Sequence, residues 1–216
     1  MNLSITRRCV EINAKTFCQN KCQIVSSIFK EPVGIQTIIV TDLHGSSKYM
    51  SDNLLASCFS NYDLCLILGD CNSYDIDRLL PYLDLSKTYG VYGNHNDYSE
   101  RLYEKYGITN IHGKSFEYNG KVFVGWEGSF KYKGSTIGMS QKESLAFEKR
   151  LPDHCDYLVS HDGVYREYDD GTPHSGLKGI SSYQGRTGCF ILRGHLHVRY
   201  ETDREQCFYR IERVIL

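Results

Sequence analysis

The feature of this sequence that most constrains its fold is a regular alternation of short apolar runs with amphipathic segments, which begins at residue 35. Strand-like runs occupy residues 35–40, 63–68 and 88–92. The first two are nearly unbroken in apolar character, as is typical of strands buried on both faces. Between the runs lie two segments of helical spacing, at residues 50–59 and 75–85, and Pro81 interrupts the second. This repetition predicts a largely parallel sheet covered by helices.

The second half of the chain carries antiparallel signals instead. Asn119-Gly120 stands between two strand-like runs within residues 114–125, which is the strongest short-range sign of a hairpin. A helix is expected at residues 141–150, and further strands at residues 156–160, 189–192, 198–202 and 207–211. The hairpin and the C-terminal strands favour antiparallel pairing. We therefore expect an α/β fold in which two sheets pack face to face with helices outside.

The length of 216 residues fits a single domain. We expect residues 35–216 to form it and residues 1–34 to be an extension of unknown role that packs on the core. Within the extension, residues 3–6 and 9–12 suit an edge hairpin and residues 21–29 a short helix. Residues 31–34, with the sequence Glu-Pro-Val-Gly, read as a linker.

Charge and cysteine content restrict the class of protein. With 25 Lys+Arg against 26 Asp+Glu, the chain lacks the basic excess that gives broad affinity for duplex nucleic acid, although a small nucleotide remains compatible. The nine cysteines are an odd number and the start of the chain lacks an apolar signal-peptide core, so we expect a cytoplasmic protein with mostly buried thiols. No run approaches the roughly 20 apolar residues of a membrane span.

Polar residues follow five of the expected strands at the point where each strand ends. The sequences are Thr41-Asp42-Leu43-His44-Gly45, Gly69-Asp70, Gly93-Asn94-His95, Ser160-His161-Asp162 and Gly194-His195-Leu196-His197. Open α/β sheets bind their ligands at the carboxyl ends of the strands. Each motif alone is a weak signal, but five of the eight histidines fall at such ends together with two aspartates. The order predicts that all of them converge on one site.

The types of side chain indicate metal binding. Two carboxylates, one amide and four imidazoles suit divalent cations such as Mn²⁺, Fe²⁺, Zn²⁺ or Co²⁺, whereas a structural zinc site would be rich in thiolates. Seven ligands are too many for one ion. Two ions about 3.5–4 Å apart, bridged by a carboxylate, would account for all of them. The seven candidates are Asp42, His44, Asp70, Asn94, His161, His195 and His197.

The order Asp-x-His, Gly-Asp, Gly-Asn-His, His and Gly-His-x-His resembles the calcineurin-like metallophosphoesterase superfamily, over about residues 35–216. The hairpin and the stretch at residues 174–179 most resemble its small bacterial and phage-type phosphodiesterases. The resemblance implies a four-layer αββα sandwich of two mixed β-sheets flanked by helices. It also implies two divalent metal ions, with Mn²⁺ expected first and Fe²⁺, Zn²⁺, Co²⁺ or Ni²⁺ as alternatives.

The resemblance further implies a role for each residue. One ion would be held by Asp42, His44 and His197, the other by Asn94, His161 and His195, and Asp70 would bridge the two. A hydroxide shared by the ions would attack phosphorus, and the catalytic residue His95 would assist the leaving group. Asn94, His95 and His174 are the expected substrate-binding residues.

Two positions depart from the family pattern. Ser73 stands where many members carry a carboxylate that orients the catalytic histidine, and Asn72 or Asp75 could take over that role. Asn96 stands where members commonly have Asp or Glu. Both departures concern the surroundings of His95, so they bear on rate and pH optimum rather than on the metal ligands.

Several other residues carry hypotheses of their own. His112 and His154 read as surface or loop residues, and an exposed, acidic Cys71 would be a redox switch. Three arginine or lysine residues are candidate phosphate contacts: Arg166, Lys178 and Arg193. The cysteines Cys9, Cys18 and Cys22 match no zinc signature and read as core or surface thiols.

The expected function is hydrolysis of a phosphodiester, with a small nucleotide or the end of a single-stranded nucleic acid as substrate. The Asp-Arg-Gly signature of protein phosphatases is missing after Gly69-Asp70, and the 17 tyrosines offer stacking partners for bases. The alternatives are a phosphomonoesterase, a dinucleoside polyphosphate hydrolase and a non-catalytic interaction module on the same fold. The oligomeric state stays open.

Overall fold

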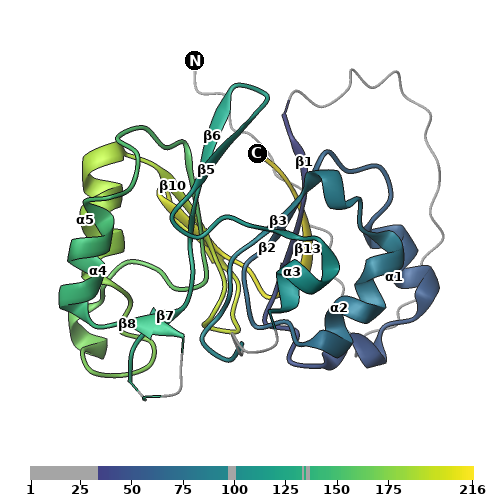
Figure 1. Cartoon of the computed structure of the whole chain (residues 1–216), viewed down its shortest axis with the longest axis horizontal. Helices are drawn as coiled ribbons and strands as arrows, with labels where there is room; N and C mark the ends of the chain where they lie inside the picture. Colours follow the sequence, from purple (N-terminus) through teal and green to yellow (C-terminus); the bar gives the residue numbers. More distant parts are fainter. Residues whose placement is uncertain (1–33, 97–100, 133, 135–136) are drawn as a thin grey trace.

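The chain folds into four layers, with two β-sheets packed face to face at the centre and helices on both outer sides (Figure 1). The structure, a computed structural model, describes residues 34–96, 101–132, 134 and 137–216. The hairpin, the short helix and the packing expected for residues 1–33 lie outside this part of the chain. The expected αββα architecture is confirmed.

Both sheets are mixed. The first has five strands in the order β13 (Arg210–Ile215), β1 (Gln36–Thr41), β2 (Leu64–Ile67), β3 (Thr88–Gly90) and β4 (Thr109–Asn110). The second has six in the order β11 (Tyr200–Glu201), β12 (Glu205–Cys207), β10 (Phe190–Arg193), β9 (Tyr157–Ser160), β6 (Lys121–Trp126) and β5 (Ser115–Tyr118). A short pair, β7 (Ser129–Phe130) and β8 (Gly138–Met139), stands apart. The strands β1 to β4 run parallel, as do β6, β9 and β10.

Helices cover the two outer faces (Figure 1). The first sheet is covered by α1 (Asp52–Cys58), α2 (Ser73–Leu79) and α3 (Leu102–Tyr106), and the second by α4 (Gln141–Glu148) and α5 (Lys178–Thr187). Short 3₁₀ turns η1 (Ser46–Tyr49), η2 (Leu80–Tyr82), η3 (Leu85–Lys87) and η5 (Glu167–Asp169) lie in the connections. Pro81 ends α2 as expected, because the helix gives way to η2. None of the helices in the described residues is long and apolar enough to span a membrane.

The unbroken apolar runs are explained by burial on both faces of a sheet. Along β2 and its flanks, Leu64, Leu66 and Leu68 pack between the two sheets. The intervening Cys65 and Ile67 pack under α1 and α2 instead. Successive side chains of a strand point to opposite faces, so both sets must be apolar when both faces are covered.

The prediction of a single strand at residues 207–211 is wrong. In the structure β12 ends at Cys207 and β13 begins at Arg210, and the two strands belong to different sheets. Phe208, which is fully buried between the sheets, and Arg210, with a φ of 71°, carry the chain across. Antiparallel pairing is correct for β11 and β13, but β12 runs parallel to β10. Apolar character alone does not show which sheet a strand joins.

Candidate metal centre

The five polar strand ends meet at one edge of the molecule, where the carboxyl ends of the two sheets face each other. Asp42 and His44 follow β1, Asp70 follows β2, and Asn94 and His95 follow β3. From the second sheet, His161 follows β9, and His195 and His197 follow β10. The sheets are linked there directly, because the backbone N–H of His195 donates to Asp42 Oδ2 at 2.9 Å. The topology thus brings together residues that are more than 150 positions apart.

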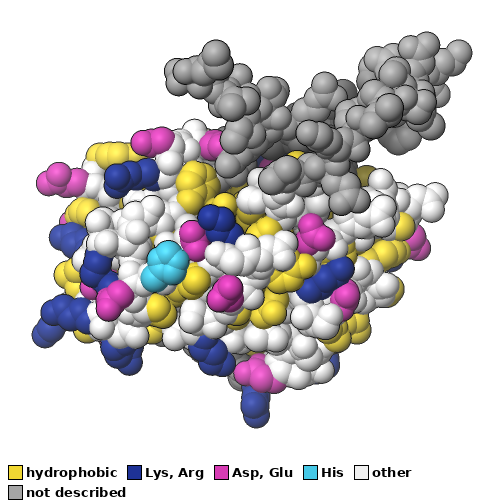
Figure 2. Space-filling model, turned by 90° about the horizontal axis from the view of Figure 1, so that it is seen from above, with side chains coloured by type: hydrophobic (Ala, Val, Ile, Leu, Met, Phe, Trp, Pro, Cys, Tyr) yellow, Lys and Arg dark blue, Asp and Glu magenta, His cyan; other side chains and the backbone are white. Residues whose placement is uncertain are grey.

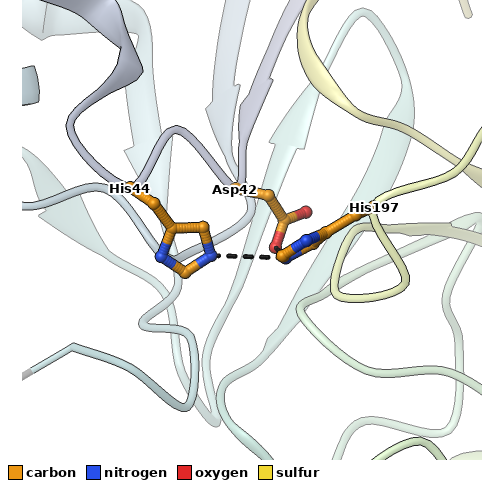
Figure 3. Close-up of side chains that lie close together, drawn as sticks. All are labelled: Asp42, His44 and His197. Carbon is orange, nitrogen blue, oxygen red and sulfur yellow. Dashed lines mark hydrogen bonds and ion pairs between the residues drawn. The ribbon is translucent and has the colours of Figure 1, made fainter.

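The first group of candidate ligands contains Asp42, His44 and His197 (Figure 3). One ligand atom from each lies within 4.8 Å of the others. The Nε2 atoms of His44 and His197 are 3.3 Å apart, and His197 Nε2 is 3.4 Å from Asp42 Oδ1. Asp42 is buried, while both histidines are partly exposed. This group is the set expected for one ion, apart from the bridging carboxylate.

The second group is fully buried and contains Asp42, Asp70 and His161. His161 Nε2 lies 3.2 Å from Asp70 Oδ2 and 2.9 Å from Asn94 Oδ1. The other ring nitrogen, Nδ1, is 2.6 Å from the carbonyl oxygen of Leu68. In the neutral ring, an Nδ1–H held by a carbonyl fixes the tautomer and leaves Nε2 with a free lone pair, which is the usual arrangement behind a ligating histidine. Asp70 is also 3.5 Å from His44 Nε2, so its carboxylate lies between the two groups.

His195 is buried beside these groups without joining either of them. Its ring lies 4.9 Å from the ring of His161, and its Nε2 contacts the carbonyl oxygen of Pro173 at 2.8 Å. The nitrogen that remains for a ligand is therefore Nδ1. The exposed ring of His174 lies 4.9 Å from that of His195, which places this residue at the edge of the site.

His95 is exposed and lies on the His44 side of the site. Its ring centroid is 5.3 Å from that of His44, and its backbone N–H donates to Asp70 Oδ1 at 2.9 Å. Asp75 and Asn72 do not take over the role of an orienting carboxylate. Asp75 accepts the N–H groups of Gly45, Ser47 and Asn72, and Asn72 caps α2. Within the described residues no side chain hydrogen-bonds the His95 ring.

The ligand loops have an unusual backbone conformation. Nine non-glycine residues of the described chain have positive φ, and five of them are candidate ligands: Asp42, His44, Asp70, His195 and His197. Such a conformation costs about 1–3 kcal/mol for each residue and persists only where the surroundings impose it. Strain of this kind clusters at functional sites, because it aims side chains in directions that regular structure does not provide.

Glycines in the motifs allow the loops to approach one another. A Cβ at Gly93 would lie 2.1 Å from Asp70 Oδ1, and a Cβ at Gly194 would lie 2.0 Å from Thr41 Oγ1. Neither distance is compatible with a side chain. Glycine is therefore required at these two positions because side chains of neighbouring segments lie against them. This requirement adds to the backbone freedom that glycine gives a turn.

The electrostatics of the site favour bound cations. Burial would raise the pKa of Asp70, but the charge of His161 outweighs it and holds that pKa well below its usual range. Burial would lower the pKa of His161, yet Asp70 and Asp42 raise it to about 9. Asp42 Oδ1 and Asp70 Oδ2 are buried and accept no hydrogen bond from the described part of the chain. Two buried carboxylate oxygens without a hydrogen bond fit divalent metal ions as their natural partners.

Asn96 is a supporting residue whose role the sequence did not reveal. Its Oδ1 accepts the N–H of Asp70 at 3.0 Å and the N–H of Gly93 at 2.7 Å. Its Nδ2 donates to the carbonyl oxygen of Cys71 at 2.8 Å. The side chain thus ties the loop after β3 to the loop after β2. A carboxylate at this position could accept both N–H groups but could not donate to Cys71, so asparagine suits this chain.

Two hypotheses from the sequence are wrong. Cys71 is 1% exposed, and burial raises the pKa of its thiol well above the usual value, so it is no exposed redox switch. Arg193 is fully buried against Asp162 and Tyr200 and cannot contact a phosphate. His112 lies in the connection between β4 and β5, and its ring stacks on Phe147. The described cysteines, in contrast, are all free and buried, as expected.

Comparison with known proteins identifies the class. A family model described as calcineurin-like phosphoesterase matches residues 35–199. Among solved structures, the protein TT1561 of Thermus thermophilus has a TM-score of 0.51 at 12% identity, covering 82% of this chain and 88% of that one. A second crystal structure has a TM-score of 0.53 at 10% identity, covering 81% and 89%. At such identities the likeness concerns the fold alone. No curated protein matches the sequence.

The fold and the site together define a metal-dependent phosphoester hydrolase. The chain belongs to the calcineurin-like phosphoesterase family. Membership implies hydrolysis of phosphoester bonds at a centre for two metal ions, and the two Asp/His groups are compatible with such a centre.

Proposed function

We propose that this protein is a dinuclear metal-dependent phosphodiesterase that acts on a small nucleotide or a related phosphodiester. The observation that carries the proposal is the pair of buried oxygens, Asp42 Oδ1 and Asp70 Oδ2, which accept no hydrogen bond from the described residues. Each lies within 3.5 Å of a histidine Nε2, namely that of His197 or His161. A carboxylate oxygen and an imidazole nitrogen that face each other at this distance can both bind the same metal ion. This geometry therefore supports metal ligation better than a structural role.

The chain's own residues divide into two ligand sets. Asp42, His44 and His197 would hold one ion, and Asn94, His161 and His195 would hold the other. Asp70 would contribute to both, because it lies between His161 and His44. When bound, the ions would neutralise charge on the phosphoryl oxygens and supply a nucleophile at neutral pH.

His95 is the proposed general acid. It is exposed, so substrate can reach it, and its backbone N–H is tied to Asp70, which holds the residue beside the ligand sets. Its ring lies next to that of His44, with an interplanar angle of 79°. A protonated imidazole at this place can donate its proton to a departing alkoxide.

We favour a phosphodiester over a phosphoprotein as substrate because the Asp-Arg-Gly signature of protein phosphatases is missing after Gly69-Asp70. Around the metal ligands, the described chain offers several side chains that would contact an organic group, including the exposed rings of His95 and His174. Figure 2 shows the molecule from above the view of Figure 1, on the side opposite the carboxyl ends of the strands, and there basic side chains are interspersed with acidic ones.

A substrate panel tests the proposal. With Mn²⁺ present, we expect hydrolysis of bis-p-nitrophenyl phosphate to exceed that of p-nitrophenyl phosphate, and chelation to abolish both. Faster hydrolysis of the monoester would favour a phosphomonoesterase, and preference for a dinucleoside polyphosphate would favour that alternative. Two bound metal ions without turnover of any ester would identify a non-catalytic module.

The variant His95→Ala tests the assignment of the general acid. We expect turnover of an alkyl ester to fall by about 10²–10⁴-fold, because the leaving group loses its proton donor. Metal content, measured by elemental analysis of the dialysed protein, should stay at that of the unmodified chain. A parallel loss of metal would show that His95 is a ligand.

A further inference from the structure

A pocket opens next to the candidate metal centre, with a volume of about 520 Å³. This volume lies within the range of small-molecule sites, and a single phosphate group would not need it. The pocket is lined by Arg166, Tyr168, Asp169, His174, Leu196, Val198, Tyr200 and Glu205. None of these residues except His174 has a role in the site described above.

Two lining residues connect the pocket to the metal centre. Leu196 stands between the candidate ligands His195 and His197 in the chain. His174 has its ring 4.9 Å from the ring of His195. The pocket therefore adjoins the His195 side of the centre, where an organic group joined to a phosphorus would have to be accommodated.

The charges of the pocket nearly cancel. The guanidinium of Arg166 pairs with Asp169, with Nε 3.3 Å from Oδ2, and also donates to the carbonyl oxygen of His174. Glu205 accepts a hydrogen bond from the hydroxyl of Tyr200, which in turn accepts one from the buried Arg193 at 2.8 Å. A pocket with its cation already paired and two carboxylates does not suit a second phosphate. It suits an uncharged group.

The chemistry of the walls favours a flat group with polar edges. Tyr168 in η5 is 83% exposed and Val198 is 49% exposed, so their apolar surfaces are open to a ligand. Tyr200 contributes a second aromatic ring, whose orientation the hydrogen bonds to Arg193 and Glu205 fix. Asp169 uses Oδ2 in the pair with Arg166, so its other oxygen can accept an N–H from a ligand.

We propose that this pocket binds the nucleobase of a nucleotide ester, with Tyr168 as the stacking surface. The inference rests on the proposed phosphodiesterase function and specifies its substrate class. A nucleobase is uncharged, planar and edged with N–H donors and acceptors, and it stacks on tyrosine whatever its identity. The pocket thus makes the enzyme prefer esters that carry a nucleoside over small alkyl esters.

Two assays on the whole chain test the proposal. The first measures binding of adenosine and of thymidine to the chelator-treated protein by NMR titration, with ribose as the reference, so that it needs no metal and no turnover. The second compares kcat/KM for adenosine 5′-(p-nitrophenyl) phosphate and methyl p-nitrophenyl phosphate with Mn²⁺. The variants are Tyr168→Ala, the conservative Tyr168→Phe, and Tyr49→Ala, whose tyrosine is 73% exposed outside the pocket lining.

We expect Tyr168→Ala to weaken nucleoside binding and to raise KM for the nucleoside ester by about 10-fold, which is within the range for stacking of one base on an aromatic ring. Its kcat/KM for the methyl ester should not change. Tyr168→Phe and Tyr49→Ala should match the unmodified chain in both assays. Nucleosides that bind no better than ribose, or equal effects of Tyr168→Ala and Tyr49→Ala, would overturn the pocket assignment. Absence of turnover on both esters, together with intact nucleoside binding, would instead refute the proposed function.

Discussion

Asn96 shows how a single side chain can hold the metal centre in place without being a ligand. The loops after β2 and β3 carry Asp70 and Asn94, and their backbone N–H groups need acceptors in a crowded place. Asn96 supplies one oxygen for two of these groups and one donor for the carbonyl of Cys71. The geometry of the candidate bridging ligand Asp70 therefore depends on an amide that would never touch a metal ion.

The variants Asn96→Ala and Asn96→Asp separate these contacts. We expect the alanine variant to lose about 1–3 kcal/mol of stability, because two backbone donors lose their acceptor, and to lose most activity as Asp70 shifts. The aspartate variant keeps the acceptor but lacks the donor to Cys71, so we expect a smaller loss of about 1 kcal/mol. Urea unfolding measures both. Asn53→Ala, on the exposed side of α1, is the control and should change little. Equal effects of all three would refute the role of Asn96.

A second residue-scale effect concerns pH. His112 Nδ1 accepts the backbone N–H of Glu127 at 3.1 Å, so protonation of that nitrogen would break the contact. Burial, together with the charges of Arg150 and Lys114, lowers the pKa of His112 from 6.5 to about 4. Between these values the unfolded chain binds more protons than the folded one, so stability falls as pH drops from 6.5 towards 4. Glu127 Oε1, 3.5 Å from Nε2, opposes the shift, so we expect a loss of about 1–3 kcal/mol.

Unfolding curves at pH 7 and pH 5 check this prediction. His112→Asn should reduce the difference in stability between the two pH values, because the titrating group is gone. His154→Asn is the matched control, since His154 has a side chain that is 73% exposed, and it should leave the difference unchanged. A difference that survives His112→Asn in full would show that other groups account for the acid sensitivity.

At the scale of elements, α5 illustrates a helix made by packing. Its sequence, KGISSYQGRT, contains two glycines and two serines, which are poor helix formers, and no helix is expected there from periodicity. The helix packs against α4, and Gly179 allows the close approach, because a Cβ there would lie 2.2 Å from the carbonyl oxygen of Ser144. Gly185 in the same helix has nothing within 4 Å of its Cβ position.

The two glycines give a matched pair of variants. Gly185→Ala should stabilise the protein by about 0.5–1 kcal/mol, because alanine has the higher helix propensity and meets no neighbour. Gly179→Ala should destabilise it by about 1–3 kcal/mol, because the new methyl group forces α4 and α5 apart. Thermal unfolding of the two variants gives the answer. If both variants were more stable than the unmodified chain, helix propensity rather than contact with α4 would determine the stability of α5.

At the scale of the whole molecule, the candidate ligands join the two sheets. Asp42 and Asp70 come from the first sheet, and His161 and His197 from the second. Two carboxylates in a buried cluster repel each other, and cations between them would remove that repulsion. Metal binding should therefore stabilise the packing of one sheet on the other, in addition to any effect on activity.

We expect the melting temperature to rise by about 5–10 °C when Mn²⁺ is present at about 100 times its dissociation constant, which corresponds to about 2.7 kcal/mol. Differential scanning fluorimetry with and without chelator measures the shift. Asp70→Asn should lose most of it, whereas the exposed control Asp203→Asn should keep it. No shift in the unmodified chain, or the same shift in Asp70→Asn, would contradict a metal centre at this place.

The sequence by itself determined the parts of this protein that follow from local pattern. The apolar runs that became β1 and β2 are almost wholly buried, as their composition predicts for strands covered on both faces. Asn119 and Gly120 both have the positive φ that their hairpin requires. The motifs at strand ends predicted that the candidate ligands meet at one edge, because parallel strands bring their carboxyl ends together.

Only the tertiary structure decided what depends on neighbours distant in sequence. It split the segment around Phe208 between two sheets, buried Arg193 and Cys71, and formed α5 on the surface of α4. It also gave Asn96 its three hydrogen bonds and left two carboxylate oxygens without any from the described residues. The physical reason is that periodicity reports which faces of an element are buried. It does not show which other elements those faces pack against. The chemistry of a polar side chain depends on the residues that it contacts there.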